Sequence, residues 1–130
     1  MSSAAAKSIK IPGPDHPITT AHNPNRVIVT FAGRVIAETQ DALTLKEANY
    51  PPVIYVPRKD ANMALLKPTE HTTYCPYKGD GSYFTISAGG REAVNAVWSY
   101  EHPHPAMAAI ADYLAFYPDR VDAIEERLGA

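Results

Sequence analysis

The segment VIVTFAGRVI, residues 27–36, decides the fold. Two runs of β-branched and aromatic residues, 27–31 and 35–36, flank the pair Ala32-Gly33. Such runs favour extended backbone, and a glycine between them favours a tight reversal of the chain. The segment therefore predicts a β-hairpin whose turn lies at Ala32-Gly33.

Short apolar runs separated by proline and glycine continue beyond this hairpin. The pattern is typical of a mainly β domain that borders on the α+β class. Asp60 is positioned to cap a short helix that carries Met63, Leu65 and Leu66 and stops at Pro68. Pro105 suits the first turn of a second short helix. Further strands are predicted at 39–46, 53–56, 72–75, 83–86 and 94–100, turns at 79–81 and 89–90, and a last strand or short helix at 121–128.

The N-terminal end differs in composition from the rest of the chain. Residues 1–25 contain four prolines and little apolar periodicity. A length of 130 residues fits one domain, and no internal repeat is present. We therefore interpret 1–25 as an extended arm that packs over the domain, and 26–130 as the domain itself.

Composition argues against several classes of function. A net charge of −2 gives no general basic surface, so binding to nucleic acid or to anionic membranes has little support. No apolar run approaches the length that crosses a bilayer. Residues 1–6 lack the basic-then-apolar order of a secretory signal. We expect a cytoplasmic protein without nucleic-acid or membrane partners.

The segment from Thr73 to Gly79 is the most unusual in chemistry, because it places a thiol, an ammonium group and two phenols within seven residues. A nearby lysine such as Lys78 can lower the pKa of a thiol and favour the nucleophilic thiolate of Cys75. Free cysteine is also among the most buried residue types, and Cys75 is equally interpreted as a small core residue.

Arg58 and Asp60 form a second candidate cluster. An arginine holds a carboxylate or phosphate with two parallel hydrogen bonds. The same donors serve an internal ion pair equally well, with Asp60 acting only as a helix cap. The residues leave both interpretations open.

Aromatic residues follow the later strands. Trp98 and Tyr100 lie on the same face of a predicted strand. Aromatic side chains on strands are usually core, and we interpret Trp98 in that way. Together with Tyr55, Tyr74 and Tyr83, however, Tyr100 fits the wall of a pocket for a flat or cationic ligand.

Metal sites and standard cofactor loops are not predicted. His102 and His104 alternate with prolines, but zinc needs three or four ligands and the remaining candidates show no standard spacing. We interpret this segment as a rigid surface turn and expect no metal. No glycine-rich phosphate loop is present, so the cofactor, if one exists, stays unknown.

Several separated motifs resemble one known family, the domain of unknown function 427, also filed under a provisional nucleotidyltransferase-like name. The resemblance covers residues 26–127, and its motifs lie in the family's order. They are the segments 55–60, 65–66, 73–79, 83–84, 98–100 and 115–117.

The resemblance implies a compact, β-tent-like pair of antiparallel sheets with one or two short helices, and a strand at 113–117. Other β-tent proteins bind small molecules or reduce oxidised methionine, often around a structural zinc. With Cys75 as its one cysteine, this sequence lacks the paired cysteines of such a zinc site. The provisional name finds no support either, because the phosphate loop and an acidic metal pair are missing.

We predict a small-molecule-binding domain whose pocket lies between the sheets and recognises an anionic or aromatic ligand. In this prediction Arg58 and Lys78 hold an anionic group, Tyr83, Tyr100, Trp98 and Thr73 line the walls, and Cys75 with Asp60 lies at the reacting or orienting end.

Two alternatives remain open: a non-catalytic interaction module, and thiol redox chemistry at Cys75. The residues do not decide whether any reaction is catalysed. An unpaired edge strand would allow a homodimer, but no residue requires one.

Overall fold

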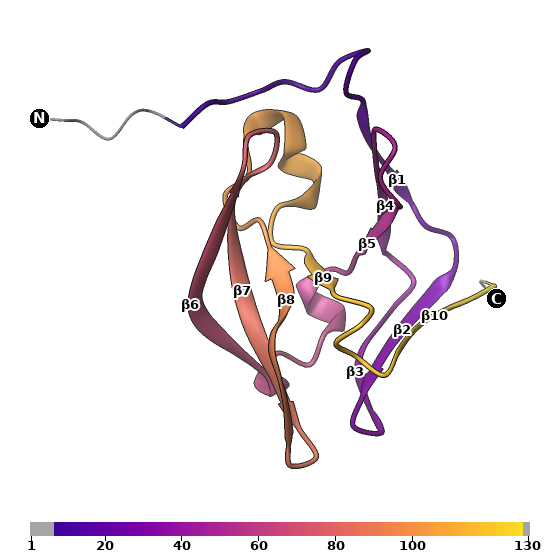
Figure 1. Ribbon diagram of the computed structural model, residues 1–130. Coiled ribbons are helices and arrows are strands. Elements are labelled where there is room, and N and C mark those ends of the chain that lie inside the picture. Colours follow the sequence, from indigo (N-terminus) through magenta and orange to yellow (C-terminus); the bar gives the residue numbers. More distant parts are fainter. Residues whose placement is uncertain (1–6, 129–130) are drawn as a thin grey trace, which may run out of the picture.

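The computed structural model describes residues 7–128 and is mainly β, as the sequence predicts (Figure 1). Within this range three antiparallel sheets are present, with the strand orders β1-β4-β5, β10-β2-β3 and β6-β7-β8-β9. The resemblance implied a pair of antiparallel sheets, whereas the structure has three antiparallel sheets among the described residues. The tent-like architecture stays a prediction.

The hairpin at residues 27–36 is confirmed. It consists of β2 (Arg26–Phe31) and β3 (Arg34–Thr39), and the turn residues Ala32 and Gly33 have φ values of 53° and 73°. Positive φ at both central positions matches the right-handed twist of the two strands. The C-terminal tail adds β10 (Ala123–Arg127) to the free edge of β2, so the strand alternative holds there.

The second sheet consists of β1 (Ile18–His22), β4 (Leu43–Glu47) and β5 (Val53–Tyr55). Its first strand belongs to the segment that the sequence assigned to the arm. Ile18 pairs with Glu47, and His22 pairs with Leu43, so the end of the arm is part of a sheet.

The third sheet is a meander of long strands, on the left of Figure 1. The turn at Gly89-Gly90 is confirmed, and so is the strand that the resemblance placed near residue 115. The predicted turn at 79–81 is wrong, because β7 already begins at Gly79 and the reversal lies at residues 76–78. The strands are β6 (Leu66–Cys75), β7 (Gly79–Ala88), β8 (Arg91–Ser99) and β9 (Leu114–Phe116).

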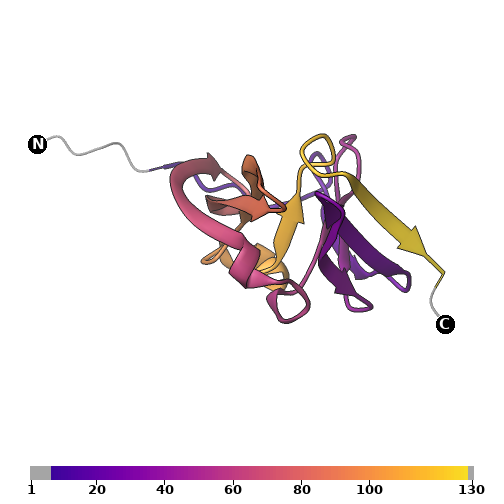
Figure 2. The ribbon, with the colours of Figure 1, turned by 90° about the horizontal axis from the view of Figure 1, so that it is seen from below.

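A backbone bridge between Val56 and Leu114 joins the second and third sheets. The amide of Val56 donates to the carbonyl of Leu114 at 2.8 Å, and the amide of Leu114 returns a bond of 2.7 Å. Figure 2 shows β2, β3 and β10 on the other side of this junction from β6–β8. The main core fills the space between them, with Val27, Ile36 and Phe116 among its buried residues.

The predicted helices are short 3₁₀ turns. Asp60 is not the cap of a helix at 60–66, because it ends the first of these turns and its carboxylate accepts a hydrogen bond of 2.7 Å from Thr39. Ala61 then pairs with Ala37, and β6 begins at Leu66, which leaves too few residues for an α-helix. The three turns are η1 (Arg58–Asp60), η2 (Met63–Leu65) and η3 (Pro105–Ile110).

Across residues 7–128, the structure has no helix with the length and apolar character needed to span a membrane.

Gly79 provides a test of the turn between β6 and β7. Its φ of +111° lies where side chains are strained, and its position for a Cβ faces the backbone of residues 102–104. We expect Gly79→Ala to lower the free energy of unfolding by about 2 kcal/mol, as measured by urea denaturation. Gly13→Ala is the control, because its φ is ordinary and no atom lies within 4 Å of the added Cβ. Equal stability of the two variants would contradict this account of the turn.

Candidate functional site

The reversal between β6 and β7 directs a lysine into the protein. The amide of Lys78 donates to the carbonyl of Cys75 at 3.2 Å, and the carbonyl of Lys78 accepts from the amide of His104 at 2.9 Å. The left-handed conformation of Gly79 lets the chain enter β7 immediately afterwards. As a result only 8% of the Lys78 side chain is exposed, which is unusual for lysine.

A carboxylate from another sheet neutralises this buried ammonium group. Glu47, the last residue of β4, accepts a hydrogen bond from Lys78 Nζ on Oε1 and contacts His16 Nε2 at 2.8 Å with Oε2. The Sγ atom of Cys75 lies 3.9 Å from Lys78 Nζ. Burial by itself raises the pKa of Glu47, but the hydrogen bonds and charges of Lys78 and His16 outweigh it and hold that pKa below its ordinary value.

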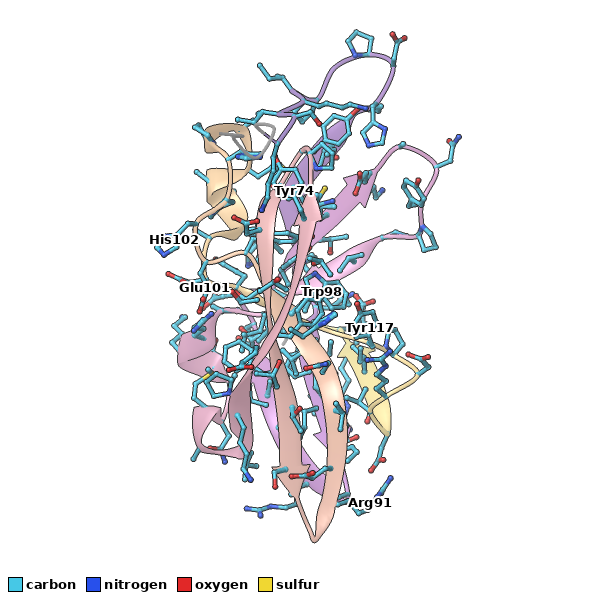
Figure 3. All side chains as sticks on the ribbon, turned by 60° about the vertical axis from the view of Figure 1, so that its left-hand side comes forward. Tyr74, Arg91, Trp98, Glu101, His102 and Tyr117 are labelled. Carbon is cyan, nitrogen blue, oxygen red and sulfur yellow. The ribbon has the colours of Figure 1, made fainter. Side chains whose placement is uncertain are left out.

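Next to this ion pair is a cavity of about 220 Å³ with a largely aromatic wall. Its charged residues are Lys78 and Glu47, and its rings come from β5, β7, β8 and the segments that follow β4, β8 and β9. Figure 3 shows Trp98 beside Tyr117, and their ring centroids are 4.5 Å apart. The lining residues are Leu45, Glu47, Tyr50, Pro51, Val53, Tyr55, Lys78, Tyr83, Trp98, Tyr100 and Tyr117.

The hydroxyl groups in this wall differ in their partners. Tyr55 accepts a long hydrogen bond of 3.4 Å from Trp98 Nε1, and Tyr83 bonds to Thr73 Oγ1 at 3.0 Å. Only 8% of Tyr100 is exposed, and its hydroxyl makes no hydrogen bond to residues 7–128. No buried side-chain oxygen of these residues lacks a partner, so this hydroxyl is accessible from the cavity. Burial raises the pKa of Tyr100 above its ordinary value, so this group is a neutral phenol at pH 7. It is therefore a free donor and acceptor beside the cavity.

Burial also raises the pKa of Tyr117, to about 12, with a further contribution from its hydrogen bond to Tyr83. The pKa of Tyr55 is raised by burial as well. These phenols carry no charge at pH 7. The ionised groups of the cavity are consequently Lys78 and Glu47, which neutralise each other.

Arg58 does not line this cavity. Its guanidinium group donates to the carboxylate of Glu101 at 2.7 Å, to Ser99 Oγ at 3.1 Å and to the carbonyl of Asp112 at 2.7 Å. Glu101 is on the left of Figure 3, away from Trp98 on the right. The structure thus gives Arg58 the internal ion pair that the sequence left as an alternative, and it does not bring Arg58 together with Lys78.

Asp60 also lies apart from the cavity. Its carboxylate accepts from Thr39 and is 3.9 Å from Lys59 Nζ. Cys75 is half-buried and does not line the cavity, although it contacts Lys78 there. Of the predicted site residues, the structure gathers Lys78, Tyr83, Tyr100 and Trp98 around one cavity, with Thr73 and Cys75 immediately behind them.

Sequence reasoning missed Glu47 and His16. Neither belongs to a recognisable motif, and they are separated from Lys78 by 31 and 62 positions. No signal in the sequence pointed to Glu47, because the segment Gly79-Asp80-Gly81 after Lys78 does not indicate that the ammonium group is buried. Among residues 7–128, no group of three histidine, cysteine, aspartate or glutamate side chains is placed to hold a metal ion.

Comparison with known proteins identifies a family. A family model with the description "Domain of unknown function (DUF427)" matches residues 19–127, which is 109 of the 130 residues. The match extends from β1 to the last residue of β10. No curated protein matches the chain.

The ion pair predicts a specific acid sensitivity. Because the folded pKa of Glu47 is depressed, its contribution to stability is complete above the ordinary value of 4.5 and is lost as the pH falls through the lower folded value. Glu47→Gln leaves Lys78 charged and without its carboxylate, so we expect a loss of about 3 kcal/mol at pH 7 and a weaker dependence of stability on pH below 4.5.

Urea denaturation between pH 7 and pH 3 measures both effects. Glu92→Gln is the matched control, because Glu92 is an exposed carboxylate 3.9 Å from Lys67 Nζ. We expect this control to follow the wild type. A Glu47→Gln profile parallel to the wild type would show that the ion pair contributes no pH-dependent stability.

Proposed function

The chain belongs to the DUF427 family, and we propose that it binds a small, uncharged aromatic molecule in the cavity beside Lys78. The observation that carries the proposal is the aromatic cavity itself, into which the uncharged hydroxyl of Tyr100 opens without a hydrogen bond to residues 7–128. Ligand pockets typically combine apolar and aromatic walls with a few polar groups that orient the ligand, and the Tyr100 hydroxyl can act as such a group.

The rings around the cavity support an aromatic ligand. Tyr83, Trp98, Tyr100 and Tyr117 come from β7, β8 and the segments that follow β8 and β9. Aromatic side chains contribute large contact areas at a low cost in conformational entropy, and they pack well against a planar guest. A volume of about 220 Å³ is below the range of about 300–1,000 Å³ of pockets for drug-sized ligands, which suits a single substituted ring.

The charges favour a neutral ligand over the anionic one that the sequence also allowed. Lys78 is already paired with Glu47, so an anionic group near the ammonium would also face the carboxylate. Arg58, the second cation of the sequence prediction, is paired with Glu101 outside this cavity. A phenol or a similar ring with one hydroxyl or amide group matches Tyr100 without adding a charge.

A thermal-shift experiment with phenol, benzoate and benzylamine tests the proposal. We expect phenol to raise the melting temperature of the wild type more than either charged compound does, because binding to the folded state alone stabilises it. In Tyr100→Phe we expect phenol to bind about fivefold more weakly, through the loss of one hydrogen bond.

Tyr74→Phe is the matched control for Tyr100→Phe. Tyr74 donates its hydroxyl to the carbonyl of Ser8 at 2.6 Å and does not line the cavity, so phenol binding should be unchanged. If phenol produced no shift at any concentration below that at which it denatures the protein, or the same shift in Tyr100→Phe, the proposed site would be wrong.

A further inference from the structure

A second cavity, apolar and of about 300 Å³, adjoins the first. It lies between the sheets, with Val27, Val29 and Ile124 contributed by β2 and β10 and Phe116 by β9. No charged side chain lines it. The full lining is Val27, Val29, Pro52, Val53, Ile54, Val56, Trp98, Phe116, Pro118 and Ile124.

The two cavities share part of their walls. Val53 and Trp98 line both of them. Neighbouring residues of the chain also divide between the two: Pro51 lines the aromatic cavity and Pro52 the apolar one, and likewise Tyr117 and Pro118. The segments around residues 52 and 117 therefore border both spaces.

Trp98 is one of the two residues that line both spaces, and it is held only weakly by hydrogen bonding. Its Nε1 donates to the Tyr55 hydroxyl at 3.4 Å, beyond the usual range of such bonds. Its other ring contacts are with Tyr55 and Tyr117. A guest that packs against the indole ring would exchange these contacts for aromatic contacts of its own.

We propose that one ligand occupies both cavities, and that it is an aromatic ring with an uncharged polar group at one end and an aliphatic substituent at the other. This inference rests on the proposed function and adds the chemical class of the ligand. The polar group faces Tyr100, the ring packs against Trp98 and Tyr117, and the aliphatic substituent lies between β2, β10 and β9.

The two cavities differ in the polarity of their walls, and this difference determines which end of the ligand enters which cavity. Lys78, Glu47 and Tyr100 all line the aromatic cavity, whereas the apolar one offers valine, isoleucine, proline and phenylalanine side chains. Water in such an apolar cavity finds few hydrogen-bond partners, so an aliphatic group gains free energy by replacing it. An aliphatic substituent in the aromatic cavity would instead leave the Tyr100 hydroxyl unpaired.

A homologous series of ligands tests this inference. Trp98 is the single tryptophan of the chain, so intrinsic fluorescence reports directly on the shared wall. The wild type is titrated with phenol, 4-ethylphenol, 4-butylphenol and 4-hexylphenol. We expect the dissociation constant to fall about fourfold for each added methylene group until the apolar cavity is full.

Ile124→Phe reduces the apolar cavity without touching the aromatic one. Ile124 is half-buried on the edge strand β10, where a larger side chain has room to adjust. We expect phenol to bind this variant as it binds the wild type, while the gain along the alkyl series is lost. Val94→Phe, the same kind of enlargement at an exposed position outside both cavities, should retain the gain.

The outcomes separate this inference from the proposed function. If phenol binds and the alkyl substituents add nothing in the wild type, the two-cavity ligand is wrong and the aromatic site stands. If no phenol of the series binds, both are wrong. The wild-type series decides these cases even if Ile124→Phe fails to fold.

Discussion

The charge of Lys78 has to be compensated inside a domain of modest size, and much of the architecture around the cavity follows from this need. An ammonium group with so little exposure to water is tolerated only when a carboxylate and further hydrogen bonds replace its solvation. Here the carboxylate is Glu47, from a different sheet. The pairing therefore fixes the reversal between β6 and β7 relative to the end of β4.

The N-terminal segment packs onto the same reversal from outside. The amide of Lys10 donates to the carbonyl of Pro76 at 3.0 Å, and His16 stacks on Tyr77 with ring centroids 4.1 Å apart. His16 also contacts Glu47, so the arm reaches the carboxylate of the ion pair. These contacts explain why an extended, proline-rich segment is ordered, and they link it to the cavity wall. The arm, the second sheet and the third sheet thus meet at a single buried charge.

Local pattern was sufficient to predict much of the fold. The hairpin at residues 27–36 and the strand at β8 have strong β-branched and aromatic runs, and both were found. The helix expected after Asp60 was not, because pairing of Ala61 with Ala37 overrides local propensity. Edge pairing of β1 was also missed, since a strand of threonine and alanine between prolines carries no alternating pattern.

For the site, the sequence predicted only contacts between residues that are close together in the chain. Lys78 and Cys75 are three residues apart, and their contact follows from the reversal itself. The pairing of Lys78 with Glu47, and of Arg58 with Glu101, depends on how the sheets associate, which no local pattern contains. The donors that recognise an anionic ligand also suit an internal carboxylate. For this reason Arg58 and Lys78 were predicted to share one site, whereas the fold places them in separate ion pairs.

The most direct measurement is a two-dimensional ¹H–¹³C NMR spectrum of the protein labelled at its tyrosine rings, recorded during a titration with 4-ethylphenol. Tyr100→Phe and Tyr74→Phe identify the signals of those two residues. The account predicts saturable shifts of the Tyr100 signals, with Tyr74 unaffected. Shifts confined to Tyr74, shifts of similar size in both, or no change at all would contradict the claim that the cavity beside Lys78 is a binding site.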